Sequence, residues 1–243
     1  LVGSEMCIRD RPYIDYVISI FMFLSGINFT LLLLMFNGKI KKFIHDAELK
    51  FYFWCVSFFT IFIAVWLHQT SSMEIEEAFR KSLFQVISLQ TSTGFATADY
   101  MLWPSILWGC LLIVMIIGAC AGSTGGGIKV SRVLILFKAI RKELSMMIHP
   151  RMVKKIKMDG HNLSHETLRS TNVYMTAYFI VLFVSLLIVC LDEYDLSTNF
   201  TAVLATLNNI GPGLELVGPT QNFALFSPLS KCVLMFDMLA GRL

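Results

Sequence analysis

Two short segments, each containing a glycine, are the best candidates for chemistry in this chain: Ser92-Thr93-Gly94-Phe95 and Asn209-Ile210-Gly211-Pro212. Extended backbone of this kind can turn its carbonyl oxygens toward one axis, where they replace the water around a cation. Glycine permits the positive φ values that this path requires, and threonine and serine add hydroxyl oxygens. We interpret both segments as ion-filter turns. An ordinary hairpin between two helices is the alternative, and two matching copies argue against it.

The helices that should hold these turns are short. Residues 78–90 and 197–209 cannot cross a bilayer, because a helix needs about 20 residues to span the hydrocarbon core. Stretches of this length are typical of re-entrant helices, and unwound backbone at membrane depth persists only where protein buries it or water lines it. Each short helix would also point its partly negative C-terminus at the ion. We therefore predict two pore helices that each lead into a filter turn.

A glycine-rich segment, Gly122-Ser123-Thr124-Gly125-Gly126-Gly127, interrupts another apolar run and is followed by Ile128 and Lys129. Three consecutive glycines disfavour a helix by about 1 kcal/mol each, so we predict a broken helix with a flexible turn beneath the filter. This turn could act as a gate; a structural kink for close helix packing is the alternative. A phosphate loop is excluded because Ile128 separates Gly127 from Lys129 and the context is a membrane helix.

Arg242 is a further candidate gating residue, near the end of an apolar run. A charged side chain within a membrane segment usually faces a cavity, and a positive charge beside a cation pathway raises the barrier to passage. The alternative is a residue at the end of a helix, close to the membrane interface.

Composition places all these segments in a membrane protein. Of the 243 residues, 56% are hydrophobic and 15% are charged, against about 25% charged residues in soluble domains. Five apolar segments are predicted to be membrane helices, the last of them incomplete: 13–36, 49–68, 103–121, 171–191 and 228–243. The six cysteines form no CxxC pair, so no disulfide framework or zinc site is indicated. No nucleophile–base set indicates an enzyme.

The order long helix, short helix, glycine turn, long helix occurs twice, which predicts an internal repeat. The expected units are a non-native leader at 1–11, the closing helix of an earlier repeat with a loop at 12–48, one repeat at 49–144, a loop at 145–167, and a second repeat at 168–243, truncated at its C-terminus. Lysine and arginine gather in the two loops, which predicts that both are cytoplasmic. Grouped charges of this kind indicate orientation and contact with membrane lipid rather than nucleic acid.

Four stretches of the sequence resemble the Trk-type potassium uptake membrane subunit: FMFLSGINF (21–29), FQVISLQTSTGFATADY (84–100), GACAGSTGGGIKVSRVLILFK (118–138) and TLNNIGPGLELVGPT (206–220). The resemblance covers nearly everything after Arg11. It implies an all-α membrane protein with helix–pore loop–helix repeats of the potassium-channel type. It further implies that this chain is a C-terminal half, with the end of repeat two, all of repeat three and most of repeat four.

The resemblance also implies roles for particular residues and partners. The transported ion would be K⁺, with ligands at Ser92, Thr93, Asn209 and Ile210 within the two filters. Gating would involve the loop from Gly122 to Lys129, and Arg242 facing the pore. The family implies a homodimer in the bacterial inner membrane, a cytosolic nucleotide-binding regulatory subunit, and uptake driven by the membrane potential or by symport. No further cofactor is expected.

Three alternatives remain at this stage. A secondary carrier with broken helices could bind a small solute at the midplane, but it does not require short helices that enter and leave on one side. A membrane-embedded enzyme would need convergent titratable residues at depth, and only Arg242 qualifies. A passive scaffold subunit would carry no flux through liposomes.

Overall fold

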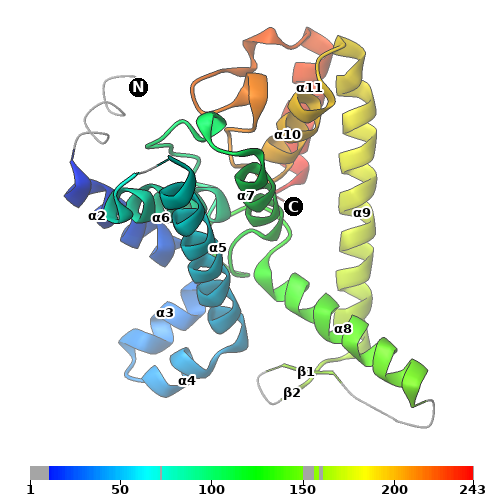
Figure 1. Ribbon diagram of the computed structural model, residues 1–243. Coiled ribbons are helices and arrows are strands. Elements are labelled where there is room, and N and C mark those ends of the chain that lie inside the picture. Colours follow the sequence, from blue (N-terminus) through cyan, green and yellow to red (C-terminus); the bar gives the residue numbers. More distant parts are fainter. Residues whose placement is uncertain (1–10, 72, 150–155, 159–160, 243) are drawn as a thin grey trace.

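The computed structural model describes residues 11–71, 73–149, 156–158 and 161–242, and its regular structure is almost entirely helical (Figure 1). The helices are α2 (Pro12–Ser25), α3 (Phe29–Phe36), α4 (Ile40–His45), α5 (Ala47–Ser71), α6 (Ile75–Gln90), α7 (Ser105–Ile117), α8 (Val130–Ile148), α9 (His165–Val189), α10 (Leu196–Leu207) and α11 (Pro228–Ala240). Short 3-10 turns occupy Tyr100–Leu102, Cys190–Asp192, Glu215–Val217 and Phe223–Leu225. Two strands, β1 (Lys157–Met158) and β2 (His161–Asn162), pair antiparallel. The all-helical class predicted from sequence is confirmed.

Two helices in the described part of the chain, α5 and α9, are long and apolar enough to cross a membrane. At 25 residues each, they measure about 38 Å, which exceeds the hydrocarbon thickness of about 30 Å. Large apolar side chains are exposed on both helices, among them Phe53, Trp54, Phe58, Ile61, Phe179, Ile180, Phe183 and Leu187. An apolar outer surface is what a lipid environment requires, so the predicted helices at 49–68 and 171–191 are confirmed.

The predicted span at 13–36 is wrong as a continuous helix, because α2 and α3 meet at an angle of 102°. The chain leaves the helical path at Gly26, where an added Cβ would lie 2.4 Å from the Tyr52 hydroxyl and 2.8 Å from Thr91 Cγ2. Asn28 then starts α3 by accepting a hydrogen bond from the Thr30 amide at 2.8 Å. Tight packing at Gly26 and a local N-cap thus produce a corner.

The predicted span at 103–121 is also wrong, because α7 has only 13 residues. Its length of about 20 Å is too short for the bilayer core. The helix ends at Gly118, whose φ of 68° is readily available to glycine. The chain then runs without regular structure to Lys129, and α8 begins at Val130. The break expected from the glycine-rich segment therefore exists, and it starts earlier than the first of these glycines.

The two short helices form the interior of the molecule. Helix α6 packs against α5, α2 and α7, and α10 packs against α9, α11 and α7. Both helices carry buried polar residues, including Ser82, Gln85, Ser88, Gln90, Thr198, Asn199 and Thr206. Buried polar side chains beneath an apolar exterior distinguish this chain from a typical soluble domain. The two turns that follow α6 and α10 are thereby placed in the centre.

The predicted organisation into repeats, with its boundaries at 49–144 and 168–243, stays a prediction. The predicted non-native leader at 1–11 lies outside the described residues, except for Arg11. Part of the predicted loop at 145–167 lies outside them as well.

Candidate functional site

The turns after α6 and α10 share three backbone hydrogen bonds at the same spacing. In the first turn they are Thr91 N to Ile87 O, Ser92 N to Leu89 O and Thr93 N to Ser88 O, and in the second they are Asn208 N to Leu204 O, Asn209 N to Thr206 O and Ile210 N to Ala205 O. Two segments far apart in sequence thus leave their helices along the same path. This likeness cannot come from a chance glycine in an ordinary hairpin.

The unusual backbone angles match as well. Ser92 and Gly94 have φ values of 56° and 76°, and Asn209 and Gly211 have 54° and 106°. Positive φ is uncommon for residues other than glycine, and strained backbone of this kind gathers at ligand-binding sites. The four positions are those at which the sequence predicts ion-filter turns.

The two turns touch each other. An added Cβ at Gly94 would lie 2.1 Å from the Ile210 carbonyl oxygen and 3.2 Å from Pro212 Cδ. A hydrogen bond of 2.8 Å from the Tyr100 hydroxyl to the Gly213 carbonyl fastens the segments beyond the turns. Structure therefore brings the two predicted filters together, and Gly94 is required because any side chain there would strike a predicted ion ligand.

The glycine-rich loop lies directly against both turns. The Gly126 amide donates to Ser92 Oγ at 3.1 Å, and an added Cβ at Gly126 would lie 2.1 Å from the Asn208 carbonyl oxygen. An added Cβ at Gly125 would lie 3.1 Å from the Thr91 carbonyl oxygen. Glycine allows backbone to approach backbone this closely, so the loop and the filter turns form one packed unit.

Two cationic side chains bind carbonyl groups of this loop. Arg242 Nη1 donates to the Thr124 carbonyl at 2.9 Å, and Lys129 Nζ donates to the Gly125 carbonyl. The Tyr174 hydroxyl, on α9, donates to the Gly127 carbonyl at 3.4 Å. The predicted gating residues therefore meet in one place, although Arg242 is far from the others in sequence. The neighbouring stretch, including Gly122 and Ser123, belongs to the same loop.

A family model for TrkH, described as a cation transport protein, matches residues 4–243. The chain belongs to this family. The sequence is 38% identical over 241 residues to the Trk system potassium uptake protein TrkH of Escherichia coli (strain K12), covering 96% of this chain and 48% of the relative. It is 31% identical over 231 residues to the Trk system potassium uptake protein TrkG of the same organism, and the match covers 95% of this chain and 47% of that relative.

A solved structure gives the same result for the fold. The crystal structure of the potassium transporter TrkH from Vibrio parahaemolyticus superposes with a TM-score of 0.88 at 34% identity, over 96% of this chain and 50% of that one. The chain thus spans about half the length of the relatives that it matches. Membership in the TrkH family places it among membrane transport proteins rather than enzymes.

Sequence reasoning missed Glu48, which lies in the lysine-rich loop that was predicted to be cytoplasmic. The side chain is buried, and its Oε1 accepts hydrogen bonds from the backbone amides of Ala121 at 2.6 Å and Ser131 at 3.1 Å. These two residues flank the glycine-rich loop on either side. One carboxylate therefore ties both ends of the loop to the start of α5. An acidic residue within a lysine-rich stretch gives no sequence signal for such a role.

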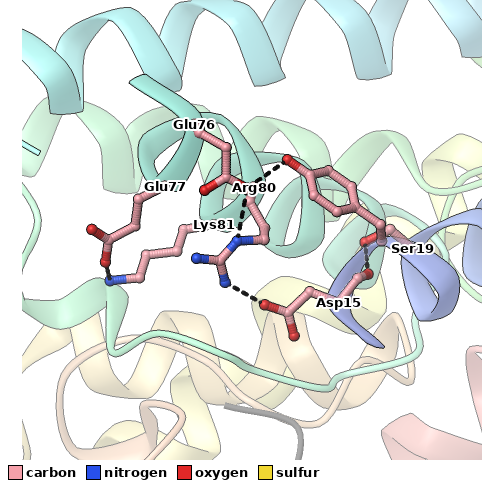
Figure 2. Close-up of polar contacts among 7 residues, drawn as sticks. Asp15, Ser19, Glu76, Glu77, Arg80 and Lys81 are labelled. Carbon is pink, nitrogen blue, oxygen red and sulfur yellow. Dashed lines mark hydrogen bonds and ion pairs between the residues drawn. The ribbon is translucent and has the colours of Figure 1, made fainter. Parts of the chain in front are cut away.

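A second missed group lies between α2 and α6 (Figure 2). Arg80 donates to Asp15 Oδ2 at 2.6 Å and to Glu76 Oε1 at 3.2 Å, and the Tyr16 hydroxyl donates to the same Glu76 oxygen at 3.0 Å. Arginine does not lose its charge in proteins, so a guanidinium is held here by two carboxylates. The separation of Asp15 and Arg80 in sequence hides this pair.

Proposed function

We propose that this chain contributes two pore-loop units to a K⁺ uptake pathway. The observation that carries the proposal is the matched pair of turns after α6 and α10, with three equivalent backbone hydrogen bonds and positive φ at equivalent positions. K⁺ would be held by oxygens of Ser92, Thr93, Asn209 and Ile210, with the rest of each filter, through Phe95 and Pro212, shaping the path. Relatives named as potassium uptake proteins support K⁺ as the transported ion.

The loop from Gly122 to Lys129 is the proposed gate. Its contacts with Ser92 and with the Asn208 carbonyl support this proposal, because a loop packed against the filter turns can obstruct ions that leave them. Arg242 and Lys129 hold the loop carbonyls and add positive charge, which opposes the passage of a cation. Displacement of the loop would therefore open the path and remove part of an electrostatic barrier.

The setting of the pathway is part of the same proposal. The units would be repeat three at 49–144 and repeat four at 168–243, preceded by the end of repeat two at 12–48. The lysine-rich loops would face the cytoplasm of a bacterial inner membrane, the transporter would be a homodimer, and a cytosolic nucleotide-binding subunit would regulate it. Uptake would follow the membrane potential or be coupled to a second ion by symport.

The test uses a hybrid transporter, in which this chain replaces the segment of E. coli TrkH that it matches. The hybrid is expressed in cells without other K⁺ uptake systems, and Rb⁺ uptake is measured per amount of membrane protein. Gly94→Ala should abolish uptake without loss of membrane insertion. The new Cβ would lie 2.1 Å from the Ile210 carbonyl oxygen, so this oxygen would have to move.

The matched control is Gly109→Ala, since an added Cβ at Gly109 meets nothing within 4 Å. Gly109 lies within α7, where alanine is a better helix former than glycine, so uptake should be unchanged. Normal uptake by the Gly94 variant would refute the filter assignment. Absence of uptake by the unsubstituted hybrid would refute the proposed function.

A further inference from the structure

The ion pair between Asp15 and Arg80 is enclosed within the protein. Only 2% of the Asp15 side chain and 13% of the Arg80 side chain are exposed. Figure 2 shows the guanidinium lying between Asp15 of α2 and Glu76 of α6, while Lys81 and Glu77 form a separate pair beside it. The planar fork of arginine suits this task, because it can serve two carboxylates at once.

This pair is poorly explained as a device for stability alone. Burial of two charges costs solvation that their attraction only partly returns, whereas removal of one partner leaves a buried charge without compensation. Asp15 Oδ1 is itself buried with no hydrogen-bond donor in the described part of the chain. A role in fixing one specific arrangement of α2 and α6 accounts better for such a pair.

Helix α2 contacts α6 at a second point, next to the filter. Gly26 directly follows α2 and Thr91 directly follows α6. An added Cβ at Gly26 would lie 2.8 Å from the Thr91 methyl carbon and 2.4 Å from the Tyr52 hydroxyl of α5. Asp15 precedes Gly26 by as many residues as Arg80 precedes Thr91. The two helices therefore run side by side in the same direction, with one contact at each end.

Two fixed points determine the tilt of a stiff helix. Helix α6 has 16 residues and a length of about 24 Å, so a small rotation at Arg80 is carried to the residues that follow Gln90. Those residues are Thr91 to Phe95, the first filter turn. The ion pair therefore acts on the position of the filter oxygens without touching an ion.

The second pore helix lacks this device. If Gly94 and Gly211 are aligned, Ser197 of α10 takes the place of Arg80. A pore helix of this fold can thus be held without an ion pair, so the charges at α6 are not a general requirement of the architecture. These charges hold the helix that precedes the first filter turn, and the helix that precedes the second filter turn has no equivalent ion pair at this position.

We propose that Arg80 and Asp15 are positioning residues that set the cation selectivity of the filter turn Ser92–Phe95. The inference rests on the proposed function, since selectivity is defined only for a conducting filter. Selectivity depends on where the oxygens lie and how strongly they bind the ion. A shift of α6 should change the ratio of Rb⁺ to Na⁺ uptake, whereas a loss of folded protein should lower both equally.

The experiment compares variants of the hybrid transporter by this ratio, which is independent of the amount of protein. Arg80→Gln and Asp15→Asn should each lower the Rb⁺/Na⁺ uptake ratio about tenfold, which corresponds to a tenfold change in the affinity of the filter for Rb⁺ relative to Na⁺. The double variant should return to within about twofold of the hybrid, because the two introduced amides can hydrogen-bond to each other across the same contact and no buried charge is left unpaired. Arg80→Lys keeps the charge but lacks the planar fork, so its ratio should lie between those of the hybrid and of Arg80→Gln.

The matched control is Lys81→Gln. It breaks the ion pair of 2.6 Å with Glu77 on the same helix, one residue from Arg80, and should leave the ratio unchanged. The inference would be overturned by an unchanged ratio in both single variants, or by a double variant as impaired as the two singles combined. In either case, uptake by the unsubstituted hybrid would still support the proposed function. Arg80→Gln and Asp15→Asn break the same ion pair from its two ends, so either one that reaches the membrane decides by this ratio.

Discussion

Glu48 offers the sharpest test of how the glycine-rich loop is held. If the loop must leave the filter for ions to pass, the bonds from Ala121 and Ser131 to the Glu48 carboxylate favour the closed position. Hydrogen bonds to a charged group contribute about 1.5–3 kcal/mol each and neutral ones about 0.5–1.5 kcal/mol. Glu48→Gln keeps an acceptor and loses the charge, so it should weaken the two bonds by about 2–3 kcal/mol in total.

That loss corresponds to a change of about 30- to 150-fold in the ratio of closed to open loop. Rb⁺ uptake by the hybrid, per amount of membrane protein, should therefore rise at least about tenfold. The control is Glu143→Gln, which removes an exposed carboxylate from α8. Uptake by the Glu48 variant that falls, or that stays within about twofold of the hybrid, would refute the reasoning.

Three further outcomes are expected. Removal of residues 125–127 should raise Rb⁺ uptake, and unaltered or lower uptake would favour a structural kink. Arg242→Ala should raise uptake by up to about thirtyfold, because a unit charge about 8 Å from the ion at an effective dielectric constant of 20 adds about 2 kcal/mol to the barrier; no rise would contradict a role facing the pore. A hydrogen bond and charge from Lys81 lower the pKa of Glu77. The Lys81–Glu77 interaction therefore stabilises the folded state at pH values above the ordinary glutamate pKa of 4.5, and this stabilisation is lost as the pH falls and Glu77 is protonated. The difference in melting temperature between Glu77→Gln and the hybrid should accordingly shrink in acid.

Sequence length and glycine placement predicted the central elements well. Residues 78–90 and 197–209 are too short to cross a bilayer, and the structure has α6 and α10 there, each leading into a turn with positive φ. These features are local, so a pattern along the chain contains them. The roles of the turn residues in ion binding stay a prediction.

The remaining features depend on contacts between distant residues. The corner at Gly26 arises from Tyr52 and Thr91, which press on the space of its missing Cβ. The burial of Glu48 arises from amides far along the chain. Around Gly26 the local signal is a long apolar run, which predicts one continuous helix. At Glu48 it is a charge in a basic loop, which predicts exposure. Both predictions are wrong.

The hydrogen bond from Gly126 to Ser92 has a thermodynamic consequence. The loop touches the first turn directly, so a shift of the loop alters the surroundings of Ser92. If that shift changes the affinity of the proposed filter for its ion, ion binding would change the preferred state of the loop by an equal free energy. Potassium would then be an effector of its own passage. Conductance in such a system would rise more steeply than in proportion to the ion concentration, without a separate ion-sensing site.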